Sequence, residues 1–132
     1  MQRVLVVEGE PDLGEVICYY LTDAGYEVTV VHDGQAGLQE MCKRKPDLIL
    51  INEQLDQVTR YQFIAQVRKT EGLSSVPIVA MVKGRVPTGR VLDAGASAVV
   101  QVPERLETLA PMVKELLAGN QPERQLAAIR NG

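Results

Sequence analysis

Short runs of apolar residues alternate along this chain with longer stretches in which apolar residues recur every three or four positions. The central run covers 46–52, where four consecutive Ile and Leu residues precede the polar Asn52. A run this short and this rich in branched aliphatic residues is typical of a strand buried on both faces. Similar runs at 3–8, 27–31, 77–82 and 98–102 complete a set of five predicted strands.

The stretches between these runs have the spacing of amphipathic helices. The first begins near Pro11, which suits the first turn of a helix, and ends at Gly25. Further helices are predicted over 35–44 and about 61–69, in a short segment ending at 93 or 94, and over about 106–117. The last one begins either after Thr108 as N-cap, with Pro111 in its first turn, or earlier, with a kink at Pro111.

Five repeats of strand and helix predict a parallel sheet with helices on both faces and right-handed crossovers. We therefore expect an α/β, flavodoxin-like (βα)5 three-layer sandwich whose five parallel strands have the order 2-1-3-4-5. This domain is expected over 1–118, followed by a tail or linker at 119–132. The strand order reverses between strands one and three, where Glu8, Gly9 and Asn52 follow the strands. A functional site is expected at that point.

Composition changes this picture little. The chain has 132 residues and a net charge of −3, so neither a nucleic-acid nor a membrane surface is expected. Cys18 and Cys42 lack metal-ligand spacing, which favours free thiols in a reduced compartment. No apolar stretch approaches the length of a membrane span and no leader pattern precedes the first strand, so a cytoplasmic location is expected.

From Arg3 to about Ala118 the sequence resembles the receiver domain of response regulators in two-component signalling. The resemblance is carried by short motifs in the order and spacing of that family, at 6–11, 24–28, 33–34, 46–50, 76–79 and 94–96. It implies transfer of a phosphoryl group from a histidine kinase to an aspartate that ends strand three. It also implies a magnesium ion held by that aspartate and by two acidic residues after strand one.

The functional positions of the family are altered in this sequence. Asn52 stands at the acceptor position, and the acidic pair has become Glu8 and Gly9. The loop after the acceptor carries Asp56 and Arg60 in place of its usual proline and glycine. The positions of a hydroxyl, a small residue, a switching aromatic and a phosphoryl-binding lysine are taken by Val82, Lys83, Val99 and Val102.

These changes remove the groups that phosphoryl transfer requires. The carboxylate of an aspartate attacks phosphorus while a metal ion and a lysine neutralise the developing charge. Magnesium prefers octahedral oxygen ligands, usually with one or two carboxylates, and Glu8 is the carboxylate left in the motif. We therefore expect a phosphorylation-independent pseudo-receiver, with no enzymatic activity, no cofactor and no metal.

Such a module is expected to signal through protein–protein contacts. A histidine kinase or an output domain is the expected partner, a homodimer is a further option, and no direct contact with nucleic acid or membrane is expected. The alternative is an unusual phospho-acceptor that uses Glu8 or Glu53. Glu53 directly follows Asn52, so its side chain should point to the opposite face.

Several polar residues near the predicted site have two interpretations. Asn52 is either a mimic of the phosphorylated state or a polar strand end that bonds a neighbouring loop. Glu8 and Glu10 either hold a divalent ion or form a solvated pair at a helix N-terminus. Lys83 either folds over the vacated pocket towards Glu8 or Asn52, or points into solvent.

Three further features complete the expectations. His32 is expected to be a surface residue in a turn. Arg60 and Tyr61 are expected in a loop, which either binds a partner or is simply solvated. The peptide before Pro103 is a candidate cis bond, as the family resemblance implies.

Overall fold

The structure is a computed structural model that describes residues 1–52, 58–84 and 89–120. Its strands are β1 (Arg3–Val7), β2 (Glu27–Val31), β3 (Leu48–Asn52), β4 (Ile78–Val82) and β5 (Ala98–Gln101). All neighbouring strands pair in parallel, in the order β2-β1-β3-β4-β5. The predicted flavodoxin-like sheet is therefore confirmed.

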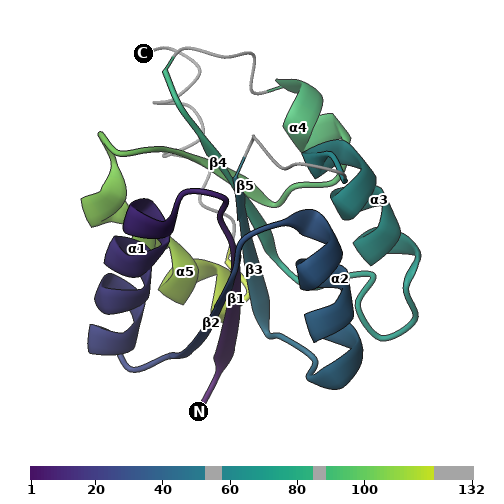
Figure 1. Ribbon diagram of the computed structural model, residues 1–132, viewed down its shortest axis with the longest axis horizontal. Coiled ribbons are helices and arrows are strands. Elements are labelled where there is room, and N and C mark those ends of the chain that lie inside the picture. The colour runs from purple at the N-terminus through teal and green to yellow at the C-terminus, as the bar shows by residue number, and fades with distance from the viewer. Residues whose placement is uncertain (53–57, 85–88, 121–132) are drawn as a thin grey trace.

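Helices cover both faces of this sheet. They are α1 (Pro11–Asp23), α2 (Gly34–Lys43), α3 (Arg60–Lys69), the short α4 (Gly89–Asp93) and α5 (Leu109–Leu117), which follows the 3-10 turn η1 (Leu106–Thr108). Figure 1 shows α1 and α5 on one side of the sheet and α2 and α3 on the other. The fold thus has the three layers that the alternating pattern predicts.

The core consists of two clusters, one on each face of the sheet. Val4 and Val6 of β1 pack on the side of α1 and α5, whereas Leu5 and Val7 pack on the side of α2 and α3. This division follows from the two-residue period of a strand. Because β3 and β4 are buried along their whole length, their sequences are continuous apolar runs rather than alternating ones.

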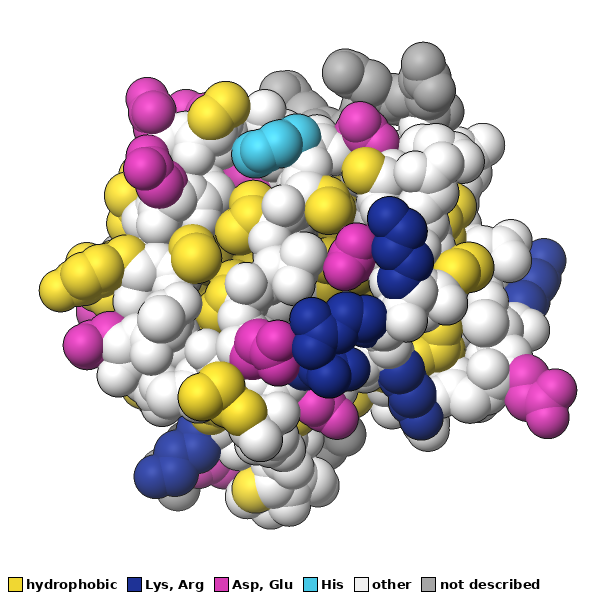
Figure 2. Space-filling model, turned by 60° about the horizontal axis from the view of Figure 1, so that its bottom comes forward, with side chains coloured by type: hydrophobic (Ala, Val, Ile, Leu, Met, Phe, Trp, Pro, Cys, Tyr) yellow, Lys and Arg dark blue, Asp and Glu magenta, His cyan; other side chains and the backbone are white. Residues whose placement is uncertain are grey.

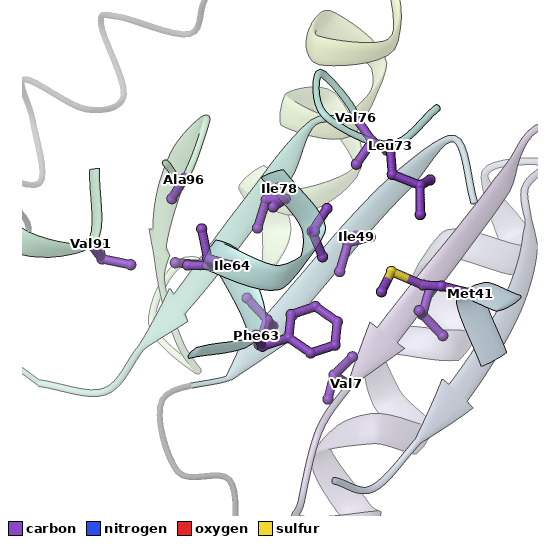
Figure 3. Close-up of a cluster of buried hydrophobic side chains, with 14 of the residues drawn as sticks. Val7, Met41, Ile49, Phe63, Ile64, Leu73, Val76, Ile78, Val91 and Ala96 are labelled. Carbon is purple, nitrogen blue, oxygen red and sulfur yellow. The ribbon is translucent and has the colours of Figure 1, made fainter. Parts of the chain in front are cut away.

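The close approach of α2 and α3 depends on a glycine. Figure 3 shows the ring of Phe63 among Val7, Ile49 and Ile64 in the core. A Cβ atom at Gly37 would lie 2.8 Å from Cε2 of Phe63, closer than side chains tolerate. The glycine in α2 therefore creates the space that the largest core side chain fills.

The start of α3 corrects one prediction. Arg60 was expected in a loop, and Tyr61 was assigned both to that loop and to the start of the predicted helix. Both are helical residues at the start of α3. Thr59 accepts a hydrogen bond from the backbone N–H of Gln62, whose side chain accepts one from the backbone N–H of Thr59. This capping box begins the helix before its apolar residues do, and a Thr-x-x-Gln signal is visible in the sequence.

The start of α5 agrees with the first of its two predicted alternatives. The helix begins after Thr108, and Pro111 lies in its first turn. The hydroxyl of Thr108 does not cap the helix, however, because it donates to the carbonyl oxygen of Arg105 at 2.6 Å. The short fourth helix, which ends at Asp93, is also as expected.

Charged side chains gather at the N-terminal edge of the sheet. Figure 2 brings this edge forward and shows Lys and Arg side chains near the middle of the face with acidic side chains beside them. Glu27 accepts hydrogen bonds from Arg3 at 3.2 Å and from Arg44 at 3.1 Å. The backbone N–H of Arg3 also donates to Asp47 at 2.7 Å, which joins the starts of β1 and β3.

This cluster predicts a specific acid sensitivity. The hydrogen bond from Arg3 is the main cause that lowers the pKa of Glu27 below its ordinary value of 4.5. A carboxyl whose pKa is lower in the folded chain stabilises the fold above its unfolded pKa, and this contribution is lost as the pH falls through the folded pKa. Glu27→Gln should therefore lose less stability than the wild type on acidification from about pH 5 to pH 3. Thermal melts across this window test the prediction, and parallel curves for the two proteins would contradict it.

Candidate functional site

A cavity of about 420 Å³ lies at the carboxyl edge of the sheet, where β1 and β3 end beside the start of α1. This is the point at which the strand order reverses. The cavity is lined by Glu8, Gly9, Glu10, Pro11, His32, Asn52 and Lys83. The structure thus brings together four predicted site residues, Glu8, Gly9, Asn52 and Lys83, and adds His32 and Glu10.

A buried pair, Glu8 and Asn52, forms the base of this site. The two residues are 1% and 3% exposed, and the side-chain amide of Asn52 donates to Oε1 of Glu8. The other carboxylate oxygen of Glu8 accepts the backbone N–H of Glu10 at 2.9 Å. Both oxygens of Glu8 therefore have partners within the chain. The expectation that Glu8 is a solvated residue is wrong, because it lies inside the sheet edge and not on the helix surface.

An ion pair lies at the rim of the same cavity. Nζ of Lys83, just after β4, is 2.7 Å from Oε2 of Glu10, just before α1. The lysine therefore reaches across the ends of the strands, as the lid interpretation supposed, but this contact is with Glu10 rather than with Glu8 or Asn52. The interpretation that Lys83 simply points into solvent is wrong. Both side chains are about half exposed, so the pair contributes roughly 1 kcal/mol or less.

The sequence was compared with protein-family models and with curated proteins. The model of the response regulator receiver domain matches residues 4–114. The chain belongs to the response regulator receiver family. Among curated relatives, the DNA-binding response regulator MtrA of Mycolicibacterium smegmatis is 30% identical over 125 residues, which cover 92% of this chain and 53% of that protein. The transcriptional regulatory protein BaeR of Escherichia coli is 29% identical over 126 residues, covering 94% and 51%. The chain thus spans about half the length of these relatives.

Solved receiver structures have the same fold as this receiver domain. The chemotaxis protein CheY4 of Vibrio cholerae superposes with a TM-score of 0.79 at 26% identity, covering 86% of this chain and 97% of that chain. The receiver domain of a sensor histidine kinase from Pseudomonas aeruginosa, with a magnesium ion coordinated in its active-site cleft, gives a TM-score of 0.81 at 27% identity, covering 89% and 98%.

Apolar side chains stand at three positions where the family resemblance implies functional groups in this receiver domain. Val82 and Val99 are buried in the cluster on the side of α2 and α3, and Val102 is buried in the cluster on the side of α1 and α5. None of the three lines the cavity. The peptide bond between Val102 and Pro103 is cis, as the resemblance implied.

The described residues that line the cavity do not fit a magnesium ion. The carboxylate of Glu8 already accepts two hydrogen bonds, and the carboxylate of Glu10 is paired with Lys83. Gly9 contributes no side chain. Within the described ranges, no group of three or more His, Cys, Asp or Glu side chains is arranged to hold a metal. A divalent ion prefers an octahedral shell of oxygen ligands, and here the amide nitrogen of Asn52 faces the carboxylate instead.

His32 lines the cavity, whereas the sequence predicted only a surface residue in a turn. Its ring is exposed, and Nδ1 lies 3.0 Å from the carbonyl oxygen of Glu8. A carbonyl can only accept, so Nδ1 carries the hydrogen in this contact and Nε2 is the acceptor of the neutral ring. The parallel register pairs Val7 with Val31, which places the residues after each strand side by side. Pairing the predicted first and second strands in this register would have placed His32 next to Glu8.

Other residues that the sequence pointed out either do not line the cavity or lie outside the described residues. Cys18 and Cys42 are free cysteines. No helix in the described part of the chain is both long and apolar enough to cross a bilayer. Glu53, Asp56 and residues 121–132 of the predicted tail lie outside the described residues.

Proposed function

We propose that this receiver domain is a signalling module that acts through protein–protein contacts without being phosphorylated, and that it has no enzymatic activity. The observation that carries the proposal is the buried hydrogen bond between Asn52 and Glu8. Asn52 occupies the place of the acceptor, and an amide is a poor nucleophile that cannot take up a phosphoryl group as a carboxylate does. In this arrangement its side-chain amide donates a hydrogen bond to the carboxylate of Glu8, which follows the neighbouring strand β1.

The surroundings of the pair support the same proposal. Phosphoryl transfer depends on groups that are positioned to neutralise charge as it develops. Val82 and Val102 provide neither a hydroxyl nor a charge at the positions where the family uses them. The ammonium group of Lys83 is engaged with Glu10 at the rim. The alternative that Glu8 itself accepts the phosphoryl group would require this buried carboxylate to give up the hydrogen bond at the oxygen that attacks phosphorus.

We further propose that the partners of the domain are proteins of two-component signalling. The relatives include a DNA-binding response regulator and a transcriptional regulator about twice as long as this chain. One structural neighbour is part of a sensor histidine kinase. An output domain or a histidine kinase is therefore the class of partner we favour, and self-association through the α4–β5–α5 surface is a further option.

Acetyl phosphate with magnesium is expected to leave the protein unmodified. Intact-mass spectra should show no added phosphoryl group on the wild type, because no described group in the cavity combines the nucleophile, the metal ligands and the countercharge that the reaction needs. Lys83→Ala should open the rim without changing this result. Asn52→Asp should also stay unmodified, since Gly9, Val82 and Val102 remain.

The controls of this experiment distinguish the two candidate functions. A receiver domain that retains the acceptor aspartate should gain the phosphoryl group under the same conditions. An adduct on the wild type that disappears in Glu8→Gln would overturn the proposal in favour of Glu8 as acceptor. An adduct in Asn52→Asp alone would show that the remaining altered positions matter less than we infer.

A further inference from the structure

Arg60, at the start of α3, is a buried cation with few partners. Its side chain and backbone together are 4% exposed, and its Nε is buried without a hydrogen-bond partner. Nη1 donates to the carbonyl oxygen of Met81, at the end of β4, over a long 3.3 Å. A guanidinium offers five N–H donors, and a buried charge is costly unless it is paired and hydrogen-bonded. Arg60 is therefore held by one long hydrogen bond, and its buried Nε has no partner.

Arg68, two turns further along the same helix, shows the opposite arrangement. Its Nε and Nη2 both donate to the carbonyl oxygen of Gly95, at 3.0 and 2.7 Å. Its Nη1 donates to the carbonyl oxygens of Ser74 and Val76, at 3.1 and 2.7 Å. This fold can thus satisfy a partly buried guanidinium with its own backbone, and it does not do so for Arg60.

A second arginine lies close to the first, on the other helix of this surface. The guanidinium carbons of Arg60 and of Arg90, on α4, are each 5.5 Å from the centre of the Tyr61 ring. Tyr61 is 37% exposed and Arg90 is exposed. None of the ion pairs found among the described residues involves either arginine, although Asp93 lies one turn along α4 from Arg90. Two positive charges therefore flank one aromatic ring at the junction of α3 and α4.

We propose that Arg60, Tyr61 and Arg90 form a docking site for the carboxylate side chains of an acidic peptide segment in a partner protein. Guanidinium groups bind carboxylates through short, charge-assisted hydrogen bonds, which the exposed Arg90 can donate at the surface. The largely buried Arg60 adds a second positive charge beside the same ring. Tyrosine and arginine are among the residue types that most often dominate protein–protein interfaces, and the partly exposed Tyr61 adds apolar contact area. The three residues do not line the cavity at Glu8, and the proposal does not depend on whether that cavity accepts phosphate.

NMR titration of the whole chain with a short poly-glutamate peptide tests the proposal. We expect saturable shifts of the Nε–H signal of Arg60 and of the Tyr61 ring, while the Nε–H signal of Arg68 stays in place. Arg90 is exposed, so Arg90→Gln should not disturb the fold. It should weaken binding about tenfold, because one charge-assisted contact is lost. Arg105→Gln, an exposed arginine beyond β5, should bind as the wild type does.

Two results would overturn the proposal. The first is an absence of saturable shifts, or equal shifts with a poly-glutamine peptide or with inorganic phosphate. The second comes from Arg60→Met, which removes a poorly satisfied buried charge while keeping the apolar stem. We expect its melting temperature to be unchanged or higher and its binding to be lost. A fall in melting temperature as large as that of Arg68→Met would show that Arg60 has a structural role instead.

Discussion

Replacing Asn52 by aspartate is expected to lower the free energy of unfolding at pH 7 by about 3 kcal/mol, the usual cost of leaving a buried charge opposed rather than paired. In the wild type the amide of Asn52 donates to Oε1 of Glu8, and both residues are buried. The substitution replaces this donor with a second carboxylate of almost the same shape. Two like charges then face each other where neither is solvated. Urea denaturation of the two proteins measures the difference.

The pH dependence and a second variant identify the cause. At low pH the facing carboxylates of Asn52→Asp can bind a proton, so the deficit relative to the wild type should shrink as the pH falls. The double variant Glu8→Gln with Asn52→Asp exchanges the two roles, because the new amide can donate to the new carboxylate and still accept the N–H of Glu10. It should recover most of the lost stability. A deficit that is independent of pH, or that the double variant does not reduce, would refute the charge argument.

The sequence predicted the fold almost completely because the fold depends on patterns that are local. Continuous apolar runs mark strands such as β3 and β4, whose side chains are buried on both faces. The predicted run at 46–52 became the strand Leu48–Asn52, since Asp47 instead bonds the backbone of Arg3. The order of the strands followed from the number of units and from the rule for crossovers, without any knowledge of individual contacts.

The site was predicted in its position but not in its contacts. Asn52, Glu8 and Lys83 were placed at one edge correctly, because the carboxyl ends of parallel strands meet there. Which carboxylate the lysine reaches depends on side-chain lengths and on the depth of each residue, and the sequence contains neither directly. Glu8 is too deep to stay solvated, so it bonds Asn52 and leaves the exposed Glu10 for Lys83.

The surface of α3 and α4 was hardest to predict, because the contacts of its side chains depend on how the two helices pack. Arg60 looked like a solvated loop residue, since arginine is mostly exposed and the apolar spacing of α3 begins after it. In the structure it is the first residue of α3, after the capping box at Thr59, and its side chain reaches the carbonyl oxygen of Met81. Arg90 meets Tyr61 only through the packing of two helices, which local patterns do not specify.

Arg68→Met should destabilise the domain by about 3 kcal/mol, since it removes several charge-assisted hydrogen bonds whose net worth is roughly 1.5 kcal/mol or more each and which overlap in effect. The guanidinium joins α3 to the segment before β4 and to the turn before β5. Gly95 has a positive φ of 121°. A Cβ atom there would lie 3.2 Å from Cγ2 of Ile64 and 3.3 Å from Cγ of Arg68, so the turn packs closely against both side chains. Burial lowers the pKa of Arg68, yet arginine stays protonated at any working pH, so the bonds persist.

Conservative replacement should recover little of this loss. Arg68→Lys keeps the charge, but one ammonium group cannot reach Gly95 and Val76 with the fork geometry of a guanidinium. Urea denaturation gives the free energies, and hydrogen exchange at the amides of Ile78 and Ser97 should quicken first, because these residues link the starts of β4 and β5 beside Arg68. Stability in Arg68→Lys equal to that of the wild type would mean that the charge, and not the set of carbonyl bonds, holds the two strands in place.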